Sequence, residues 1–338
     1  MSDGEEAAPG LSVVIPCKDG AARLPQTLRA IGDQEVPAAI EVVVADDGSK
    51  DGTREIAAAA RTPWGPVRVV RHEAPRGRGA ACNTAIAVSR APVIVILDDD
   101  MTLQPGALEA HRAFHAAHPG AAALGRIPLA PAARLDCYGR FLEREEAHRE
   151  RTLAAHAAGV PFRYCLTGHF SAPRATLEAA GGFDASITRY GFEDIDLAWR
   201  MTRRGTKIHW LPAAVAQHRN DAGGLDRMLE RHREAGLVAR QLAARHPEEE
   251  FRQFLRAGEG APLELGRIPA ALSALRLLHR ALQVAPLRRL AASGPGFGLV
   301  RGAIGLAEAA GAERLAHFGY HVARDIRYFE ALFDAPGA

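Results

Sequence analysis

The chain has 338 residues, which is enough to bury a sizeable core in one large domain with a smaller one. Hydrophobic residues make up 47% and charged residues 24% of the sequence, a globular balance that argues against a disordered protein. The formal net charge of +2 gives no electrostatic case for a nucleic-acid partner.

The cysteines and the hydrophobic runs bear on the compartment of the protein. No CxxC pair occurs among the four scattered cysteines, which argues against a zinc site and favours a reduced protein. Residues 1–10 are acidic, lack the apolar core of a signal peptide, and are expected to be flexible. The run 91–97 is too short to cross a membrane and predicts a buried strand. We therefore expect a cytoplasmic protein and leave a peripheral contact with a membrane open.

Short apolar runs alternate with helical patterns through the first half of the chain. Strands that alternate with helices indicate an α/β fold with a mostly parallel sheet whose faces are covered. Ligands bind beyond the carboxyl ends of the strands in such sheets. Strands are predicted over 11–16, 41–45, 67–71 and 93–97, and helices over 23–31, 53–61 and 80–89.

The second half of the chain is mainly helical. A helix is predicted over 135–158, another over 193–204, and a short strand over 207–211. Beyond about residue 225 the pattern is helical almost to the end. We therefore predict three parts, which are the N-terminus 1–10, an α/β domain over 11–224 and a helical C-terminal subdomain over 225–338.

One stretch of the C-terminal subdomain, 268–290, combines a leucine-rich face with four arginines. We expect this helix to pack on its own domain, and a membrane surface is the alternative partner. The arginines are Arg276, Arg280, Arg288 and Arg289.

The first acidic cluster, Asp98-Asp99-Asp100, comes directly after the strand 93–97. Alternation along a strand places Asp98 and Asp100 on the same side. Carboxylates with no cysteine nearby suit Mg²⁺ or Mn²⁺, which can bridge a diphosphate and neutralise its charge as it leaves. The simpler interpretation is an acidic turn that caps a helix beginning at Gly106.

Two further acidic clusters have equally simple alternatives. Asp46 and Asp47 follow the strand 41–45, where a carboxylate can accept from a base N–H or a ribose hydroxyl, but the run is also typical of a turn whose residues 50–53 cap the next helix. Glu193 and Asp194 open a predicted helix, either as dipole partners or as a general base for a hydroxyl. The helix dipole would hold the pKa of Asp194 low.

Taken together, four segments resemble the family 2 glycosyltransferases, which have the GT-A nucleotide-sugar-binding fold. Each motif is weak alone, but the four occur in register over residues 11–218. They are LSVVIPCKDGAARLPQTLRAI, EVVVADDGSKDGT, RGRGAACNTAIAVSRAPVIVILDDDM and LTGHFSAPRATLEAAGGFDASITRYGFEDIDLAWRMTRRGTKIHWLPAAVAQH.

The resemblance implies a role for individual residues at the metal and the reacting centre. Asp100 would hold Mn²⁺ or Mg²⁺ and His218 would complete the metal site, where a plain surface histidine is the alternative. Asp194 matches the catalytic base, with Glu193 as its neighbour. The family members with these motifs invert the anomeric centre, which needs a single carboxylate base.

The resemblance also implies a set of residues near the donor. Pro16 and Asp19 would line the base pocket, and Asp46 or Asp47 would contact the base or the ribose. The expected base is uracil. His169 departs from the family pattern, so its role stays open. The remaining residues near the donor would be Arg76, Gly77, Asn83, Asp98 and Asp99.

Two other functions compete with this interpretation. A sugar nucleotidyltransferase would carry a glycine-rich basic loop after its first strand, where this chain has Pro16-Cys17-Lys18-Asp19-Gly20. A catalytically inactive nucleotide-sugar-binding protein would be expected to lose the acidic motifs, which are present. The sequence does not distinguish a saccharide, lipid-linked, peptide or small natural-product acceptor.

Overall fold

The structure, a computed structural model, describes residues 9–129, 136–157, 159–219, 223–255 and 284–334. The chain divides into two compact units. The second unit takes in two short segments from within the predicted α/β domain. The first unit comprises Met1–Pro131, Glu145–Thr188 and Glu193–Asn220, and the second comprises Ala132–Arg144, Arg189–Phe192 and Asp221–Ala338.

An eight-stranded sheet is the framework of the first unit, with the strand order β5-β2-β1-β6-β9-β8-β10-β7. Four of its pairs are parallel, and β9 and β7 run antiparallel to their neighbours. The predicted α/β fold with a mostly parallel sheet is therefore confirmed. The strands are β1 (Leu11–Cys17), β2 (Ile40–Asp46), β5 (Arg68–Arg71), β6 (Val93–Leu97), β7 (Met101–Leu103), β8 (Ala122–Arg126), β9 (His169–Pro173) and β10 (Ile208–His218), with β3 (Arg61–Thr62) and β4 (Gly65–Pro66) forming a separate hairpin.

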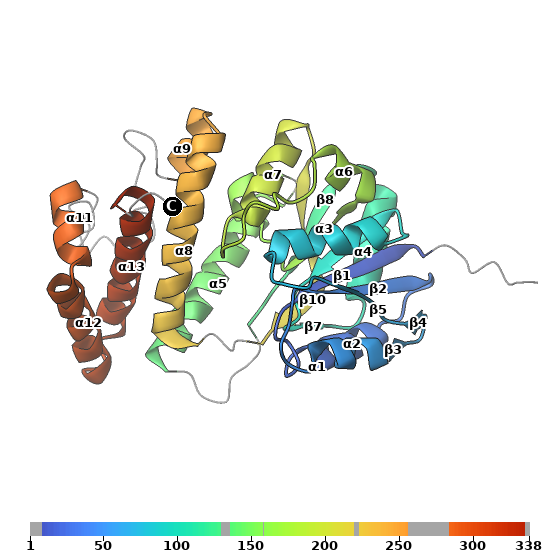
Figure 1. Cartoon of the computed structure of the whole chain (residues 1–338), viewed down its shortest axis with the longest axis horizontal. Coiled ribbons are helices and arrows are strands. Elements are labelled where there is room, and N and C mark those ends of the chain that lie inside the picture. Colours follow the sequence, from blue (N-terminus) through green and yellow to red (C-terminus); the bar gives the residue numbers. More distant parts are fainter. Residues whose placement is uncertain (1–8, 130–135, 158, 220–222, 256–283, 335–338) are drawn as a thin grey trace, which may run out of the picture. The chain divides into compact units, whose positions relative to one another are not determined.

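Helices cover both faces of the parallel part of this sheet, with α1 and α2 on one face and α3 on the other (Figure 1). This covering explains why every residue of β1 and β2 is buried. The helices of this unit are α1 (Leu24–Gly32), α2 (Thr53–Ala59), α3 (Arg78–Val88), α4 (Ala107–Ala117), α6 (Arg174–Ala179), α7 (Glu193–Arg203), the 3₁₀ turn η1 (Phe162–Tyr164) and the part of α5 (Cys137–Ala155) that begins at Glu145.

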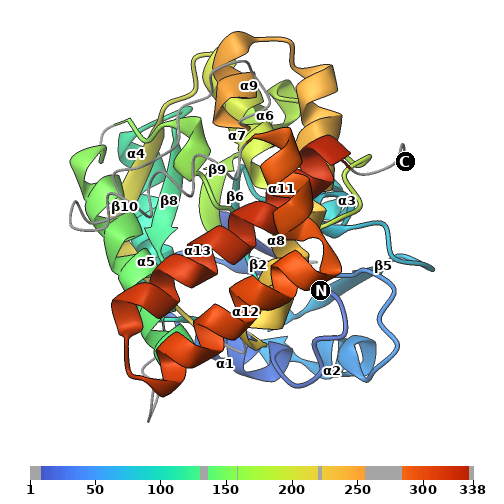
Figure 2. The same cartoon turned by 90° about the vertical axis from the view of Figure 1, so that its left-hand side faces the viewer.

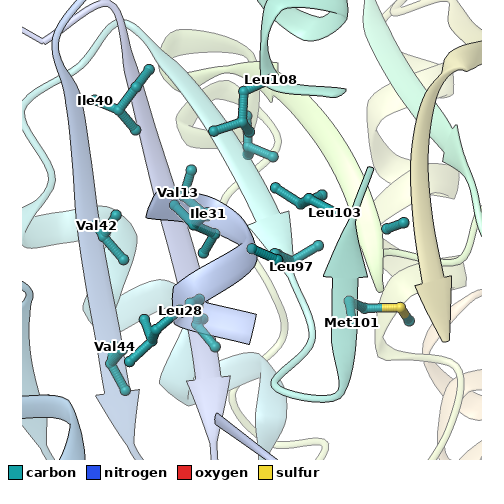
Figure 3. Close-up of a cluster of buried hydrophobic side chains, with 14 of the residues drawn as sticks. Val13, Leu28, Ile31, Ile40, Val42, Val44, Leu97, Met101, Leu103 and Leu108 are labelled. Atoms are coloured by element: carbon teal, nitrogen blue, oxygen red, sulfur yellow. The ribbon is translucent and has the colours of Figure 1, made fainter. Parts of the chain in front are cut away.

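The main core lies between α1 and the sheet. Leu28 and Ile31 of α1 pack against Val13, Val44 and Leu97 (Figure 3). Apolar residues at this spacing give α1 one buried face, and alternation along the strands supplies its partner surface. This packing fixes the carboxyl ends of β1, β2 and β6, which carry the acidic clusters.

The second unit is helical, and α11, α12 and α13 lie side by side (Figure 2). Its own core includes Tyr138, Phe141, Phe318 and Tyr320. Among the described residues, no helix combines the length and the apolar character needed to span a membrane. The helices are α8 (Gly224–Arg245), α9 (Glu249–Phe254), α11 (Ala285–Ala292), α12 (Gly294–Ala309), α13 (Glu313–Phe329) and the π-helical turn η4 (Glu330–Asp334).

The arginine-rich stretch 268–290 is described only in its last part. Arg276 and Arg280 lie outside the described residues. Arg288 is buried, and its Nε donates to Asp334 at 3.0 Å. Arg289 is exposed and shares that carboxylate at 3.1 Å. Arg288 therefore belongs to the packing of the second unit, while residues 268–283 of the stretch lie outside the described residues.

Candidate active site

The triplet Asp98–Asp100 forms a turn between β6 and β7. The alternative that these residues cap the next helix is wrong, because α4 begins after Gly106 and has no side-chain cap. Strand β7 intervenes and pairs with β10. Each aspartate instead meets a different partner.

Asp100 lies beside His218. In the antiparallel register of β7 and β10, His218 is opposite Met101, the residue after Asp100. This register places Nε2 of His218 at 3.2 Å from Oδ2 of Asp100. Although burial opposes ionisation, the bond to His218 holds the pKa of Asp100 below its usual value. The histidine is therefore part of this cluster and not an isolated surface residue.

These two side chains fit a divalent cation. Oδ1 of Asp100 is buried and has no hydrogen-bond partner in the described part of the chain, so a cation would satisfy it. A carboxylate with an imidazole suits Mn²⁺, and Mg²⁺ also accepts the carboxylate. The described residues contain no group of three or more His, Cys, Asp or Glu side chains that could hold a metal. Asp100 and His218 therefore offer two ligands for such an ion.

Asp98 is joined to the start of α7 through Arg78. Nε and Nη2 of Arg78 donate to one Asp98 oxygen at 3.1 and 2.7 Å, and Nη1 lies 3.6 Å from a Glu193 oxygen. Arg78 also donates to the Thr167 hydroxyl at 2.8 Å. Gly168 lies so close that a Cβ there would be 2.7 Å from Oδ2 of Asp98. The guanidinium of Arg78 therefore connects the end of β6, the residues before β9 and the start of α7.

Glu193 and Asp194 form an acidic pair in the first turn of α7. Burial and the neighbouring charge of Glu193 raise the pKa of Asp194 to about 7, although Arg78 opposes the shift. The expectation of a low pKa is therefore wrong. A helix terminus contributes about 0.3–1 kcal/mol, which is less than the combined cost of desolvation and a like charge.

Both side-chain oxygens of Asp99 accept hydrogen bonds from other side chains. Nε and Nη2 of Arg23 donate to its two oxygens at 3.2 and 2.9 Å, and the Cys17 thiol lies 2.9 Å from Oδ2. Burial raises the pKa of Asp99 despite these donors. The structure thus places this predicted donor-binding residue in a network that ties the end of β1 to the triplet.

Asp46 and Asp47 differ in how many partners they have. The two oxygens of Asp47 accept from the backbone N–H groups of Arg76 and Gly77 at 2.8 and 2.9 Å, and from His72 at 2.6 Å. Asp46 accepts from the Ser49 N–H through Oδ1, while its buried Oδ2 makes no hydrogen bond among the described residues and lies 3.5 Å from Nε of Arg71. Oδ2 of Asp46 is therefore held by an ion pair alone.

Residues 47–52 form the predicted turn, but the cap position of α2 is Gly52 and provides no side-chain cap. Asp51 accepts from the Thr53 N–H at 3.0 Å at the start of α2. Asp19 lies across from it, with φ of 48°, and accepts from the Lys50 N–H at 2.8 Å. Pro16 is buried in β1 opposite Ala45. Asp19 thus remains exposed beside the carboxyl ends of β1 and β2.

Gly77 and Asn83 hold the loop and helix that follow β5. Gly77 has φ of 93°, and a Cβ there would lie 3.0 Å from the Ile187 carbonyl oxygen, so only glycine fits without strain. Asn83 donates to the Phe183 carbonyl and accepts from the Phe183 N–H, both at 2.8 Å. Its side chain therefore ties α3 to the loop 181–184, and the Arg76 side chain is exposed.

His169 begins β9, and its side chain meets His111 of α4. Its ring is fully buried, and its Nε2 is 2.9 Å from Nε2 of His111. His111 and His115 both bond to the Ser171 hydroxyl at 2.8 Å. Burial lowers the pKa of His169 and of His115 to about 4. The structure thus places His169 in a neutral polar chain inside the unit.

Arg78 is the main site residue that the sequence analysis did not single out. It occupies the first position of α3, where the helix dipole disfavours a cation. An arginine at that position, after the exposed Arg76, is itself a signal that a carboxylate lies nearby. Arg23 and His72 were missed because their partners are far away in sequence.

Residues 12–168 match the model of the family described as "Glycosyl transferase family 2". Among curated proteins, the chain is 28% identical over 265 residues to validoxylamine A glucosyltransferase of Streptomyces hygroscopicus subsp. limoneus, covering 72% of this chain and 57% of the relative. It is 26% identical to pre-mycofactocin glycosyltransferase of Mycobacterium tuberculosis, covering 70% and 48%. The chain thus spans about half to three fifths of the length of these relatives.

Solved structures show the same fold. The mannosyltransferase PcManGT from Pyrobaculum calidifontis, in complex with GDP-Man and Mn²⁺, superposes with a TM-score of 0.58 at 21% identity, covering 97% of this chain and 88% of that one. S. aureus TarS 1-349 in complex with UDP gives 0.52 at 16% identity, covering 93% and 91%. Residues 12–168, which carry three of the four motifs and the start of the fourth, are thus identified as a glycosyl transferase family 2 region, and the solved structures show the same fold.

Proposed function

We propose that the chain is an inverting, metal-assisted glycosyltransferase that moves a sugar from a nucleotide diphosphate to an acceptor hydroxyl. The observation that carries this proposal is the link that Arg78 makes between Asp98 and Glu193. It puts the acidic turn after β6 and the acidic start of α7 in one site. Binding of the donor at the first and proton removal from the acceptor hydroxyl at the second can then serve one transfer.

Asp194 is the proposed general base. It would accept the proton of the acceptor hydroxyl while that oxygen bonds to the anomeric carbon and the diphosphate leaves from the opposite face. A base works best when its pKa lies near the working pH, and a pKa of about 7 meets this condition. One ionised carboxylate is sufficient for an inverting transfer, so Glu193 is assigned to Arg78.

Arg78 keeps this site together electrostatically. Burial disfavours its charge, but Asp98 and Glu193 raise its pKa well above the usual value, so it stays protonated. Its guanidinium pairs with both Asp98 and Glu193 and orients the start of α7. A cation held by Asp100 and His218 would supply positive charge for the leaving diphosphate.

Uridine is the proposed nucleoside. The support is Oδ2 of Asp46, which makes no hydrogen bond in the described part of the chain, faces Arg71 Nε only at 3.5 Å, and can accept the N3–H of uracil. One structure of similar fold contains GDP-Man and another contains UDP. Binding measurements must therefore decide between guanine and uracil. Thymine shares the N3–H and is the nearest competitor.

The proposed acceptor is a hydroxyl-bearing molecule, and small natural products are the first class to test. The support is that two relatives are named for validoxylamine A and pre-mycofactocin. Saccharide, lipid-linked and peptide acceptors form the next panel.

A thermal-shift screen tests the donor part of this proposal. Nucleoside diphosphates and nucleotide sugars are compared with and without Mn²⁺, since a ligand that binds only the folded state raises the melting temperature. We expect UDP and a UDP-sugar to give the largest Mn²⁺-dependent shift. No shift from any nucleotide would contradict the proposal, and a larger shift from GDP would replace uridine by guanosine.

A further inference from the structure

Arg149 of α5 has an unused pair of hydrogen-bond donors. Its Nη1 donates to Oε1 of Glu146 at 3.1 Å. Its Nε and Nη2 are buried and have no partner in the described part of the chain. The side chain as a whole is 16% exposed, so water reaches little of it. Buried donors without partners destabilise a fold, and such exceptions call for a ligand or another explanation.

In other arginines of this unit, the same two nitrogens donate to carboxylates. Nε and Nη2 together form one side of the guanidinium fork, which matches a carboxylate or phosphate. Arg23 uses this side on Asp99 and Arg126 uses it on Glu150. Arg149 presents the same side with no acceptor. The chemistry of the missing partner is therefore that of an oxyanion.

The first unit places Arg149 at the end of the sheet that carries the site. Arg126, at the end of β8, holds Glu150 of α5 through contacts of 2.7 and 3.1 Å. Two residues further along, the Pro128 carbonyl accepts from the His218 N–H at 2.9 Å. These contacts fix α5 beside the strand that delivers His218.

Electrostatic coupling joins Arg149 to both halves of the site. Burial of the Cys165 thiol raises its pKa, Asp194 raises it further and Arg149 lowers it, so Cys165 lies within reach of both charges. Burial also raises the pKa of Glu146, while Arg149 and His218 both lower it. Glu146 accepts from Nη1 of Arg149 alone, so the Nε–Nη2 side keeps no acceptor in the described part of the chain.

We propose that Arg149 is an anion-binding residue whose Nε–Nη2 side takes a phosphoryl oxyanion. This inference rests on the proposed function, in which the nucleotide diphosphate is the first source of that anion. An anionic group on the acceptor is the second source. Arg149 makes no bond to the reacting carbon in either case and acts by binding and charge.

The test measures binding to Arg149→Met and Arg149→Lys. The matched control is Arg151→Met, which removes an exposed arginine from the same helix. Affinities for UDP and uridine are measured by calorimetry with Mn²⁺. Arg149→Met should weaken UDP binding by about 10- to 100-fold and leave uridine unchanged, because only UDP carries the diphosphate. Arg149→Lys should fall between, because an ammonium cannot present the fork.

The two sources of the anion give different results. If UDP binds Arg149→Met as it binds wild type, inorganic phosphate is titrated into the UDP complexes. Stabilisation of the wild-type complex that Arg149→Met lacks would assign the fork to an acceptor anion. Equal UDP binding by Arg149→Met and Arg151→Met, together with no phosphate effect, would overturn the proposal, as would an equal loss for UDP and uridine.

Failure of the proposed function gives a distinct result. If no nucleotide binds wild type, the glycosyltransferase proposal fails by itself. Pyrophosphate with Mn²⁺, which has neither base nor sugar, then tests the fork alone. Stabilisation of wild type that Arg149→Met lacks keeps the anion site, and no difference between the two removes it.

Discussion

Nε2 of His218 lies 3.2 Å from Oδ2 of Asp100, although 118 positions separate the two residues in the sequence. The antiparallel pairing of β7 with β10 creates this contact. The buried, unpartnered second oxygen of Asp100 makes the pair more than a surface ion pair. The first prediction follows from it.

Asp100→Asn should lose the Mn²⁺-dependent part of nucleotide-diphosphate binding, and His218→Gln should weaken it by about tenfold or more. In Asp100→Asn, a neutral amide oxygen replaces the carboxylate and is a poorer metal ligand. In His218→Gln, an amide replaces the imidazole nitrogen that would bind the metal. UDP titrations with Mn²⁺ and with excess chelator measure this part. Full binding or turnover in chelator would refute the metal assignment.

Asp194→Asn should lower turnover by about 10²–10⁴-fold while donor and metal still bind, because only the proton acceptor is removed. Glu193→Gln should cost less, since Arg78 retains Asp98. Initial rates with authentic donor and acceptor decide between them. The reverse order would move the base to Glu193, and two active variants would show that neither residue is the base.

The raised pKa of Asp194 predicts the pH dependence of activity. A base must be ionised, so kcat/KM should fall about tenfold per pH unit as the pH drops below about 7. A rate profile that is flat between pH 5 and pH 8 would contradict this prediction.

The same pKa predicts a cost to stability. The folded protein holds the Asp194 proton more tightly than the unfolded chain, so stability falls as the pH rises from about 4 to about 7. Asp194→Asn cannot ionise and should therefore melt higher than wild type at pH 8, with little difference at pH 4. Equal melting temperatures at pH 8 would show that ionisation of Asp194 does not destabilise the folded protein.

The buried histidines predict a change of stability with pH in the opposite direction, a loss as the pH falls. Burial lowers the pKa of His169 and His115 to about 4, so the unfolded chain takes up protons first. Their contribution is complete above about pH 6.5 and is lost as the pH falls toward 4. His169→Gln can still bond His111 but cannot be protonated, so its loss of stability between pH 6.5 and pH 4 should be shallower. Exposed His156→Gln is the control, and equal slopes would contradict this account.

The sequence predicted the parallel half of the sheet because its strands are rich in Val and Ile. Strands β8 and β9 were missed, since AALGR and HFSAP lack β-branched residues and depend on neighbouring strands. The predicted strand 207–211 is the first part of β10, which continues to His218. Pro212 within it hid the continuation, because proline is unusual inside a strand.

For the site, the sequence supplied the acidic residues and the structure supplied their partners. The resemblance pointed to Asp100 and His218, and the register of β7 and β10 brings them together. Partners such as Arg78 for Asp98 depend on long-range packing, which no local pattern encodes. The pKa of Asp194 could not be predicted because burial outweighs the helix dipole.

Metal-dependent cleavage of a nucleotide sugar tests the central claim most directly. Release of the nucleoside diphosphate from a UDP-sugar panel is followed with Mn²⁺, using wild type, Asp100→Asn and Asp194→Asn. We predict release by wild type with Mn²⁺, little release in chelator or by Asp100→Asn, and UDP binding without turnover by Asp194→Asn. Binding of the donor with no cleavage or transfer by wild type under any metal condition would contradict the account and leave a nucleotide-sugar-binding protein.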